Sequence, residues 1–398
     1  MPHSSGTRTP LKAAALKFVL MIGVLSFFAD FTYEGARSIN GPFLAILGAS
    51  ATVVATVAGL GELLGYGLRV FSGRLSESTG KFWPITFVGY IIQMASVPLL
   101  ALAGTWQIAA LLIITERVGK AIRNPPRDVM LSHAAREIGY GWGFGLHEAL
   151  DQFGALFGPL LVAFVISLRS DYHRAFAVLL VPAVIVLILL GIARWLYPRP
   201  EDLEPSPPPD VRTTGLPRVF WIYMAGAALV AAGFADFSLI AFHFEKTRSV
   251  PPDWVPILYA IAMGVSGTGS LLFGRIFDRA GITILIPLTI VTLAFAPLVF
   301  LGSFWLALAG ATIWGLGMGV HESIIPAAVA TMVPPHRRPS AYGVFTAAYG
   351  VFWFLGSLIM GLLYGISILA VIAFCMATQV ISIPLFVKVR RIMVRQPA

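Results

Sequence analysis

Charged residues are scarce in this chain of 398 residues. They occupy 12% of the positions, whereas hydrophobic residues occupy 57%. A soluble domain carries about twice that share of charge, so this composition excludes most soluble folds. Twelve apolar spans of ~20–25 residues, joined by short loops, account for the whole length. Because backbone groups in lipid must be hydrogen-bonded within their own segment, we expect an all-α membrane protein.

Other missing sequence features limit the bonds, energy sources and reactions that this chain can use. The only cysteine, Cys375, excludes a disulfide within the chain. No Gly-x-x-x-x-Gly-Lys-Ser/Thr loop occurs, so ATP is not the direct energy source of any transport. No set of nucleophile, base and orienting group is visible either. We therefore expect no cofactor and no enzymatic activity, and a membrane-embedded enzyme is the less favoured alternative.

Histidines raise the question of a metal. The zinc-protease pattern His-Glu-x-x-His needs two imidazoles on one helical face. His147 is followed at the fourth position by Asp151, and His321 by Ile325, so neither copy completes the pattern. We expect no resident metal. A transported metal ion, held by His147, Asp151, His321 and Glu322, remains an alternative cargo.

The basic residues are spread through short loops between apolar runs, although the net charge is +9. This placement is typical of membrane orientation and not of nucleic-acid binding. With both termini inside, five of the 28 Lys and Arg residues fall outside or near the outer face. We therefore expect a multi-pass protein of the bacterial inner membrane with cytoplasmic termini and a retained first span. The five are Arg37, Arg169, Arg174, Lys246 and Arg248.

The apolar runs divide the chain into two sets of six. A proline-rich, charged segment at 197–217 separates them and reads as an extended linker. We expect an N-terminal bundle over 1–196, a cytoplasmic linker over 197–217 and a C-terminal bundle over 218–398. The twelve runs lie at about 16–37, 43–70, 83–103, 106–127, 141–167, 173–195, 218–243, 254–273, 282–301, 304–330, 341–365 and 367–388.

Short motifs recur in the same order in both sets. Phe28-Ala29-Asp30-Phe31 returns as Phe234-Ala235-Asp236-Phe237, and Gly73-Arg74-Leu75 returns as Gly274-Arg275-Ile276. In addition, Gly145 and Gly158 match Gly343 and Gly356 at the same spacing. Three ordered matches indicate duplication of a six-helix unit. Parallel six-helix repeats are typical of one large transporter fold.

The repeated loops resemble the major facilitator superfamily, whose loop between helices 2 and 3 reads Gly-x-x-x-Asp-Arg-x-Gly-Arg-Arg. The first copy departs from it at Ser78 and Phe82, and the second at Ile282. The resemblance implies that Glu77 and Asp278 steady a cytoplasmic gate by accepting hydrogen bonds from a helix N-terminus. The alternative is that they only cap helix ends. The matching residues are Gly73, Glu77, Gly80, Lys81, Gly274, Asp278, Arg279 and Gly281.

Two further features bear on this resemblance. Residues 33–38 and 119–128 resemble an uncharacterised bacterial subgroup of the superfamily, a likeness that narrows the fold and not the cargo. Gly154-x-x-x-Gly158-Pro159 resembles half of the motif found in antiporters of the superfamily, with Leu160 and Leu161 in place of its last two glycines. Ordinary close packing of helices is the alternative reading of these small residues.

Ionisable residues at membrane depth gather on particular helices. On lipid-facing positions each would cost roughly 3 kcal/mol, so we expect them to face a watery cavity or a partner. Their spacing places them on single helical faces. In the superfamily fold, helices 1, 4, 7 and 10 line the cavity, with helix 5 beside them. The residues are Asp30, Glu34 and Arg37 (helix 1), Glu116, Arg117, Lys120, Arg123 and Arg127 (helix 4), His147, Glu148 and Asp151 (helix 5), Asp236 (helix 7), and His321 and Glu322 (helix 10).

Each of the following charged residues has two alternative roles. A carboxyl in a cavity of low dielectric favours its protonated form, so Asp30 and Asp236 can carry a proton. A fixed hydrogen bond to a neighbouring helix backbone is the alternative for both. Glu34 and Arg37 form either a helix-end ion pair, the favoured reading, or substrate contacts. Glu116 is a candidate for substrate binding or coupling.

Contacts between helices give three more expectations. Lys120 and Arg123 can neutralise Glu148 and Asp151 across the contact between helices 4 and 5, as a gate or a structural pair. Arg117 lies nearer the middle of the membrane and is a coupling candidate. Glu62 is expected to pack against helix 11. The aromatic residues Trp314, Tyr349 and Trp353 are interpreted as interfacial anchors or core, and cavity lining is the alternative for Trp314 and Tyr349.

These features predict a secondary transporter that moves a small solute by alternating access, coupled to protons or another ion, and most consistent with an exporter or antiporter. The mixed charges favour a zwitterion, an organic ion or a polar metabolite. A metal-ion or lipid transporter of the same fold and a non-transporting sensor are the alternatives. We expect a monomer in the lipid bilayer and no nucleic-acid partner.

Overall fold

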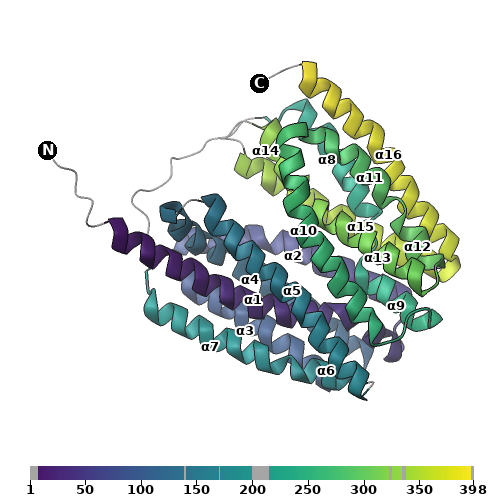
Figure 1. Cartoon of the computed structure of the whole chain (residues 1–398), viewed down its shortest axis with the longest axis horizontal. Coiled ribbons are helices and arrows are strands. Elements are labelled where there is room, and N and C mark those ends of the chain that lie inside the picture. The colour runs from purple at the N-terminus through teal and green to yellow at the C-terminus, as the bar shows by residue number, and fades with distance from the viewer. Residues whose placement is uncertain are drawn as a thin grey trace.

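The computed structural model describes residues 8–138, 140–169, 171–199, 215–321, 325–333 and 338–395, which form helices joined by short turns (Figure 1). In this part of the chain, ten helical segments are long and apolar enough to cross a membrane. α13 (Phe304–Gly319) is a shorter apolar helix. α4 (Trp106–Ile138) is long enough but carries the predicted charged stripe. Together they give the twelve predicted membrane helices.

The first six spans form the N-terminal half. The sixth span is made of two consecutive helices, and Asp171 caps the first of them by accepting hydrogen bonds from the amides of His173 and Arg174. The elements are α1 (Arg8–Ile46), α2 (Ala51–Thr79), α3 (Phe82–Leu99) continued by η1 (Leu100–Leu102), α4, α5 (Tyr140–Arg169), α6 (Tyr172–Val178) and α7 (Leu180–Leu196).

The last six spans form the C-terminal half. The seventh span of the chain is broken between Ala232 and Phe237. The tenth includes α13 and α14, and residues 322–324 between them lie outside the described residues. The elements are α8 (Arg218–Ala232), α9 (Phe237–Thr247), α10 (Trp254–Ala280), η3 (Gly281–Ile284), α11 (Leu285–Thr292), α12 (Phe295–Leu301), α13, α14 (Ile325–Met332), α15 (Arg338–Ile366) and α16 (Ile368–Arg395). Of the predicted linker, residues 200–214 lie outside the described residues.

The first span is longer than predicted. α1 continues through Arg37 to Ile46, and α2 begins only at Ala51, where the Ser50 side chain caps it. The expectation that Arg37 marks the outer end of this span is therefore wrong. Residues 38–45 are all buried, among them the apolar Ile39 and Phe43, so the helix continues into the protein interior.

The repeat predicted from the sequence is visible in the helix packing. A Cβ atom added at Gly158 on α5 would overlap the carbonyl oxygen of Phe31 on α1. A Cβ atom added at its counterpart, Gly356 on α15, would overlap the carbonyl oxygen of Ala232 on α8. In both halves the fifth helix thus contacts the first backbone to backbone. Close packing, one of the two interpretations of the Gly154–Gly158 motif, accounts for Gly158.

Replacing Gly158 by Ala should destabilise the protein by about 1–3 kcal/mol, because the added methyl group forces α5 and α1 apart. The measurement is thermal unfolding of the purified protein in detergent. Gly191→Ala on α7 is the matched control, since no atom lies within 4 Å of a Cβ added there. Equal unfolding temperatures of the two variants would contradict this account of the α1–α5 contact.

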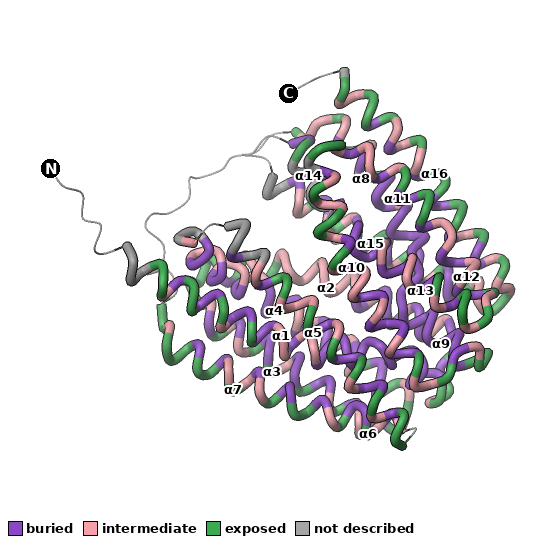
Figure 2. Tube along the Cα trace, viewed as in Figure 1, coloured by how far each residue is buried: buried purple, intermediate pink, exposed green. Residues whose placement is uncertain are grey.

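The two halves pack closely on one side of the protein and diverge on the other. The start of α1 and the end of α16 lie on one side of the helical assembly, here called the terminus side, and the ribbons of the halves diverge toward it (Figure 1). On the opposite, far side, one buried apolar cluster joins the halves and includes Phe43 and Phe176 together with Phe242 and Phe300. A second cluster is confined to the N-terminal half. Figure 2 shows buried residues concentrated where the halves touch.

α9 lies at the centre of the far-side contact. In the most apolar window of the seventh span, 89% of residues are buried inside the protein, whereas the other apolar spans reach at most 44%. A Cβ atom added at Gly41 on α1 would overlap the carbonyl oxygen of Ser238 on α9, so these helices touch backbone to backbone. The far side is closed by this packing.

Candidate solute-binding site and ion-pair network

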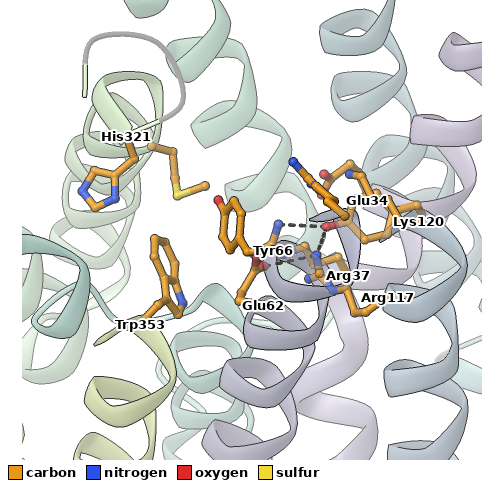
Figure 3. Close-up of a pocket in the computed structure, with 12 residues that line it drawn as sticks. Glu34, Arg37, Glu62, Tyr66, Arg117, Lys120, His321 and Trp353 are labelled. Carbon is orange, nitrogen blue, oxygen red and sulfur yellow. Dashed lines mark hydrogen bonds and ion pairs between the residues drawn. The ribbon is translucent and has the colours of Figure 1, made fainter. Parts of the chain in front are cut away.

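A polar pocket of about 90 Å³ lies between the halves. Helices α1, α2 and α4 supply its N-terminal wall, and residues near the end of α13 and on α15 supply the opposite wall. In Figure 3, His321 and Trp353 face Glu62, Tyr66 and Arg37 across this space. Its lining is Tyr33, Glu34, Arg37, Glu62, Gly65, Tyr66, Arg69, Arg117, Lys120, Met318, His321 and Trp353.

A buried ion-pair network forms one wall of the pocket. An Arg37 nitrogen lies 3.1 Å from a Glu62 oxygen and 3.1 Å from an Asp236 oxygen. Arg117 approaches the same Glu62 oxygen at 3.1 Å. Removing one member of a buried pair leaves an uncompensated charge, which costs about 3–5 kcal/mol. The network therefore holds its helices in a defined arrangement.

Asp236 lies at the end of a helix, whereas its counterpart Asp30 lies within α1. Asp236 stands at the break of the seventh span, where its carboxylate accepts a hydrogen bond from the Ser238 amide and caps α9. The same carboxylate pairs with Arg37 of the other half. A fixed hydrogen bond to the helix backbone, one of the two predicted alternatives for Asp236, is thus present.

Further polar contacts join the halves around and beyond this network. Tyr259 on α10 donates a hydrogen bond to Glu34 at 2.5 Å. Thr52 on α2 donates to the carbonyl of Gly361 on α15 at 2.9 Å. The predicted ion pair between Glu34 and Arg37 is absent from these described residues, because each binds a residue of the C-terminal half instead. The helix-end interpretation of this pair is therefore wrong.

A second charged cluster lies within the N-terminal half. Asp30 is 3.5 Å from Arg123, whose side chain is fully buried. Arg123 donates to Gln93 at 2.5 Å, and Gln93 donates to Glu116 at 2.7 Å. Glu116 lies 3.6 Å from Arg117, which lines the pocket. These contacts form a continuous relay from Asp30 to the pocket.

Helix α5 adds a carboxyl and a histidine to this cluster. His147 lies 3.5 Å from Asp151 and 2.9 Å from the hydroxyl of Ser26. The charge of Asp30 acts on Asp151. The Oδ1 atom of Asp151 has no hydrogen-bond partner among the described residues. Asp30 and Asp151 are thus neighbouring carboxyls in a mostly buried site.

Several predicted partners differ from those observed. Arg123 pairs with Asp30 and not with Asp151 or Glu148, and Lys120 lies over the Tyr33 ring, its ammonium nitrogen 3.8 Å from the ring centre. The exposed Glu148 instead accepts a hydrogen bond from Gln152. No close ion pair joins Lys120 or Arg123 to Glu148 or Asp151 among these described residues, because Arg123 points toward α1 and α3. The gate or structural pair across the α4–α5 contact therefore stays a prediction.

Glu62 differs from expectation, whereas Trp314 follows the favoured interpretation of it as core. α2 does pack on α15, but through Gly59 against Ser357, whereas Glu62 turns to Arg37 and Arg117. Trp314 is fully buried and donates its N–H to the carbonyl of Ala235 at the helix break, so it does not line the pocket.

The predicted gate loops lie on the terminus side. Glu77 is exposed and has no hydrogen bond or ion pair with any described residue. Gly80 ends α2 with φ +63°, a left-handed conformation that favours glycine. Lys81 and Arg279 are exposed, and no atom lies within 4 Å of a Cβ added at Gly274. The side chain of Asp278 and all of Glu322 lie outside the described residues, so the gating role stays a prediction.

Sequence reasoning missed part of the pocket. Tyr66 and Arg69 follow Glu62 at i+4 and i+7, the spacing that identified the stripes on α1 and α4, so they could have been recognised. Trp353 had no such signal. Within the described residues no group of three His, Cys, Asp or Glu side chains is placed to hold a metal ion.

Two six-helix halves around a charged pocket, closed on one side and diverging on the other, define a membrane transporter of the alternating-access class. The chain belongs to the Major Facilitator Superfamily, whose family model matches residues 19–357.

Known proteins resemble the chain to different extents. It is 39% identical to the uncharacterised protein Rv2265 of Mycobacterium tuberculosis, over 95% of this chain and 94% of that protein. It is 28% identical to the multidrug resistance protein MdtH of Yersinia pestis, over 46% of this chain and 43% of that protein. A crystal structure of a bacterial homolog of the human lysosomal transporter Spinster matches with TM-score 0.70 at 15% identity, covering 100% of both chains.

Proposed function

We propose that this chain is a proton-coupled secondary transporter that exports a small solute across the bacterial inner membrane in exchange for protons. It works as a monomer, with both termini in the cytoplasm. The terminus side is then the cytoplasmic side, in agreement with the bias of Lys and Arg toward it. With its far side closed by helix packing, the described conformation corresponds in this proposal to the one that takes up solute from the cytoplasm.

The relay from Asp30 to the pocket carries this proposal. Protonation of Asp30 removes the charge that balances Arg123. Arg123 then changes its interaction with Gln93, and this change is passed through Glu116 to Arg117 at the pocket. A proton bound at one site thereby alters the charges that meet the solute at another. Such linkage is what exchange of a proton for a solute requires.

The direction of transport is supported by two further observations. The partial relative MdtH is named as a multidrug resistance protein, which supports export. The Asp30–Asp151 cluster and the pocket occupy separate places, so a proton and a solute need not compete for the same atoms. Separate sites linked by one network suit an exchanger that binds them in turn.

The direct test is solute flux in liposomes. A panel of metabolites and drugs is first screened for compounds that raise the melting temperature of the purified protein. The best compound is then followed in proteoliposomes with an imposed pH gradient. We expect flux to run opposite to the proton gradient and to collapse when an ionophore dissipates it. Flux that is indifferent to the gradient would refute proton coupling.

A further inference from the structure

The pocket contains hydrogen-bond donors that lack acceptors. Three buried polar atoms of its lining have no hydrogen-bond partner among the described residues, namely Nε of Arg37, Nε of Arg69 and Nε1 of Trp353. All three are N–H donors. Buried polar groups in native structures are nearly always hydrogen-bonded, so a set of one kind indicates a ligand of the opposite kind. That ligand carries acceptors.

Two cations of the lining also form no close ion pair within the described residues. Neither Lys120 nor Arg69 forms an ion pair with a described carboxylate, and each lies instead over an aromatic ring. The ring is Tyr33 for Lys120 and Tyr66 for Arg69. Aromatic faces attract cations but do not neutralise them. Both positive charges are therefore available to a solute in the pocket.

The acidic residues of the pocket each have a partner. One oxygen of Glu62 binds two arginines, and one oxygen of Glu34 accepts a hydrogen bond from Tyr259. The lining holds four Lys and Arg side chains against these two carboxylates. The pocket therefore has an excess of positive charge and of N–H donors.

We propose that the transported solute is a small organic anion, with a carboxylate, phosphonate or similar oxyanion group and an apolar part. This inference names the cargo of the exchanger proposed above and rests on that function. The oxyanion binds Lys120 and Arg69 on the N-terminal wall and the Trp353 N–H on the opposite wall. The apolar part contacts Met318 and the rings of Tyr66 and Trp353. An anion held in this way bridges the halves and draws them together on the terminus side.

The test uses four probes of similar size and different charge. Benzoate and phenylphosphonate are the anions, benzyltrimethylammonium is the cation, and benzyl alcohol is the neutral compound. Binding to purified protein is measured by isothermal titration calorimetry at two salt concentrations. We expect an anion to bind at least tenfold more tightly than the cation or the alcohol. We also expect its affinity to fall as salt is raised, because salt screens the attraction.

Substitutions of residues in the pocket lining test where the anion binds. Lys120→Gln should weaken binding of the anion at least tenfold, and Arg69→Gln should act in the same direction. Arg69→Lys keeps the charge and removes Nε, so it should weaken binding less than Arg69→Gln. Trp353→Phe removes one N–H donor and keeps an aromatic ring, and it should weaken binding several-fold. Lys388→Gln, at an exposed position of α16, is the control and should leave the affinity unchanged.

Each other outcome overturns the proposal. These outcomes are failure of both anions to bind, equal or tighter binding of the cation or the alcohol, and an affinity unchanged by Lys120→Gln and Arg69→Gln. The experiment needs no pH gradient, so it separates cargo from coupling. Anion binding together with gradient-independent flux would refute the proton exchange and leave the anion site in place. Gradient-driven export of a cation would refute the anion site and leave the proton exchange in place.

Discussion

Replacing Asp30 by Asn should abolish pH-gradient-driven transport while leaving the protein folded. Asn is nearly isosteric with Asp but cannot take up a proton, and it removes the charge that Arg123 faces at 3.5 Å. The relay through Gln93 and Glu116 then stays in one state whatever the pH. We expect gradient-driven flux to fall at least tenfold, to the level of liposomes without protein.

A second assay on the same variant isolates the coupling step. Exchange of labelled for unlabelled solute without a pH gradient needs the pocket but no net proton movement, so it should persist in Asp30→Asn. Asp253→Asn is the matched control, because Asp253 precedes α10 outside both charged clusters. Unchanged pH-dependent transport in Asp30→Asn would remove this residue from the coupling role.

Asp236→Asn should open the far side of the protein. The substitution keeps a side chain that can cap α9 but removes the negative charge from Arg37, the ion pair that joins the halves at 3.1 Å. Removing the charge of one member of a buried ion pair costs about 3–5 kcal/mol. This cost falls on the described conformation, so the equilibrium should shift strongly toward a conformation in which the halves separate there.

Spin labels can measure this shift. Leu102, after α3, and Ile366, at the end of α15, lie on the far side in different halves, and their exposed fractions are 80% and 79%. Labelled cysteines at these positions, in a Cys375→Ala background, should show a longer distance by double electron–electron resonance in Asp236→Asn than in the parent.

Asp171→Asn is the matched control for this experiment. Asp171 also caps a helix, α6, but its ion pair with Arg174 lies within one half. Its substitution should leave the distance distribution between the two labels unchanged. If Asp236→Asn left the distribution unchanged as well, the Arg37–Asp236 pair would not hold the far side closed.

Much of the fold could be predicted from the order of residues. Long apolar runs require helices because lipid offers the backbone no hydrogen-bond partners, which gives twelve spans. The recurrence of the Asp30 segment around Asp236 indicates two related halves. The charges of α1 and α4 had to face inward, since lipid would penalise them, and Arg37, Arg117 and Lys120 do line the pocket.

The partners of those charges could not be predicted in the same way. Asp30 and Asp236 occupy equivalent places in the repeat, yet Asp30 lies within a continuous helix beside Arg123, whereas Asp236 caps a broken one and binds Arg37. Sequence spacing gives the face of a helix on which a charge lies. It does not say which distant helix that face meets, nor where a buried helix breaks.

Membership of a helical face is a local property, set by the 3.6-residue period and by the high cost of charge in lipid, and the order of residues suffices for it. Partner choice depends on contacts such as those of Gly41 with Ser238 and Gly59 with Ser357, which bring segments roughly two hundred or more residues apart within ångströms. Those contacts, and with them the pocket's surplus of donors, exist only in the assembled helices.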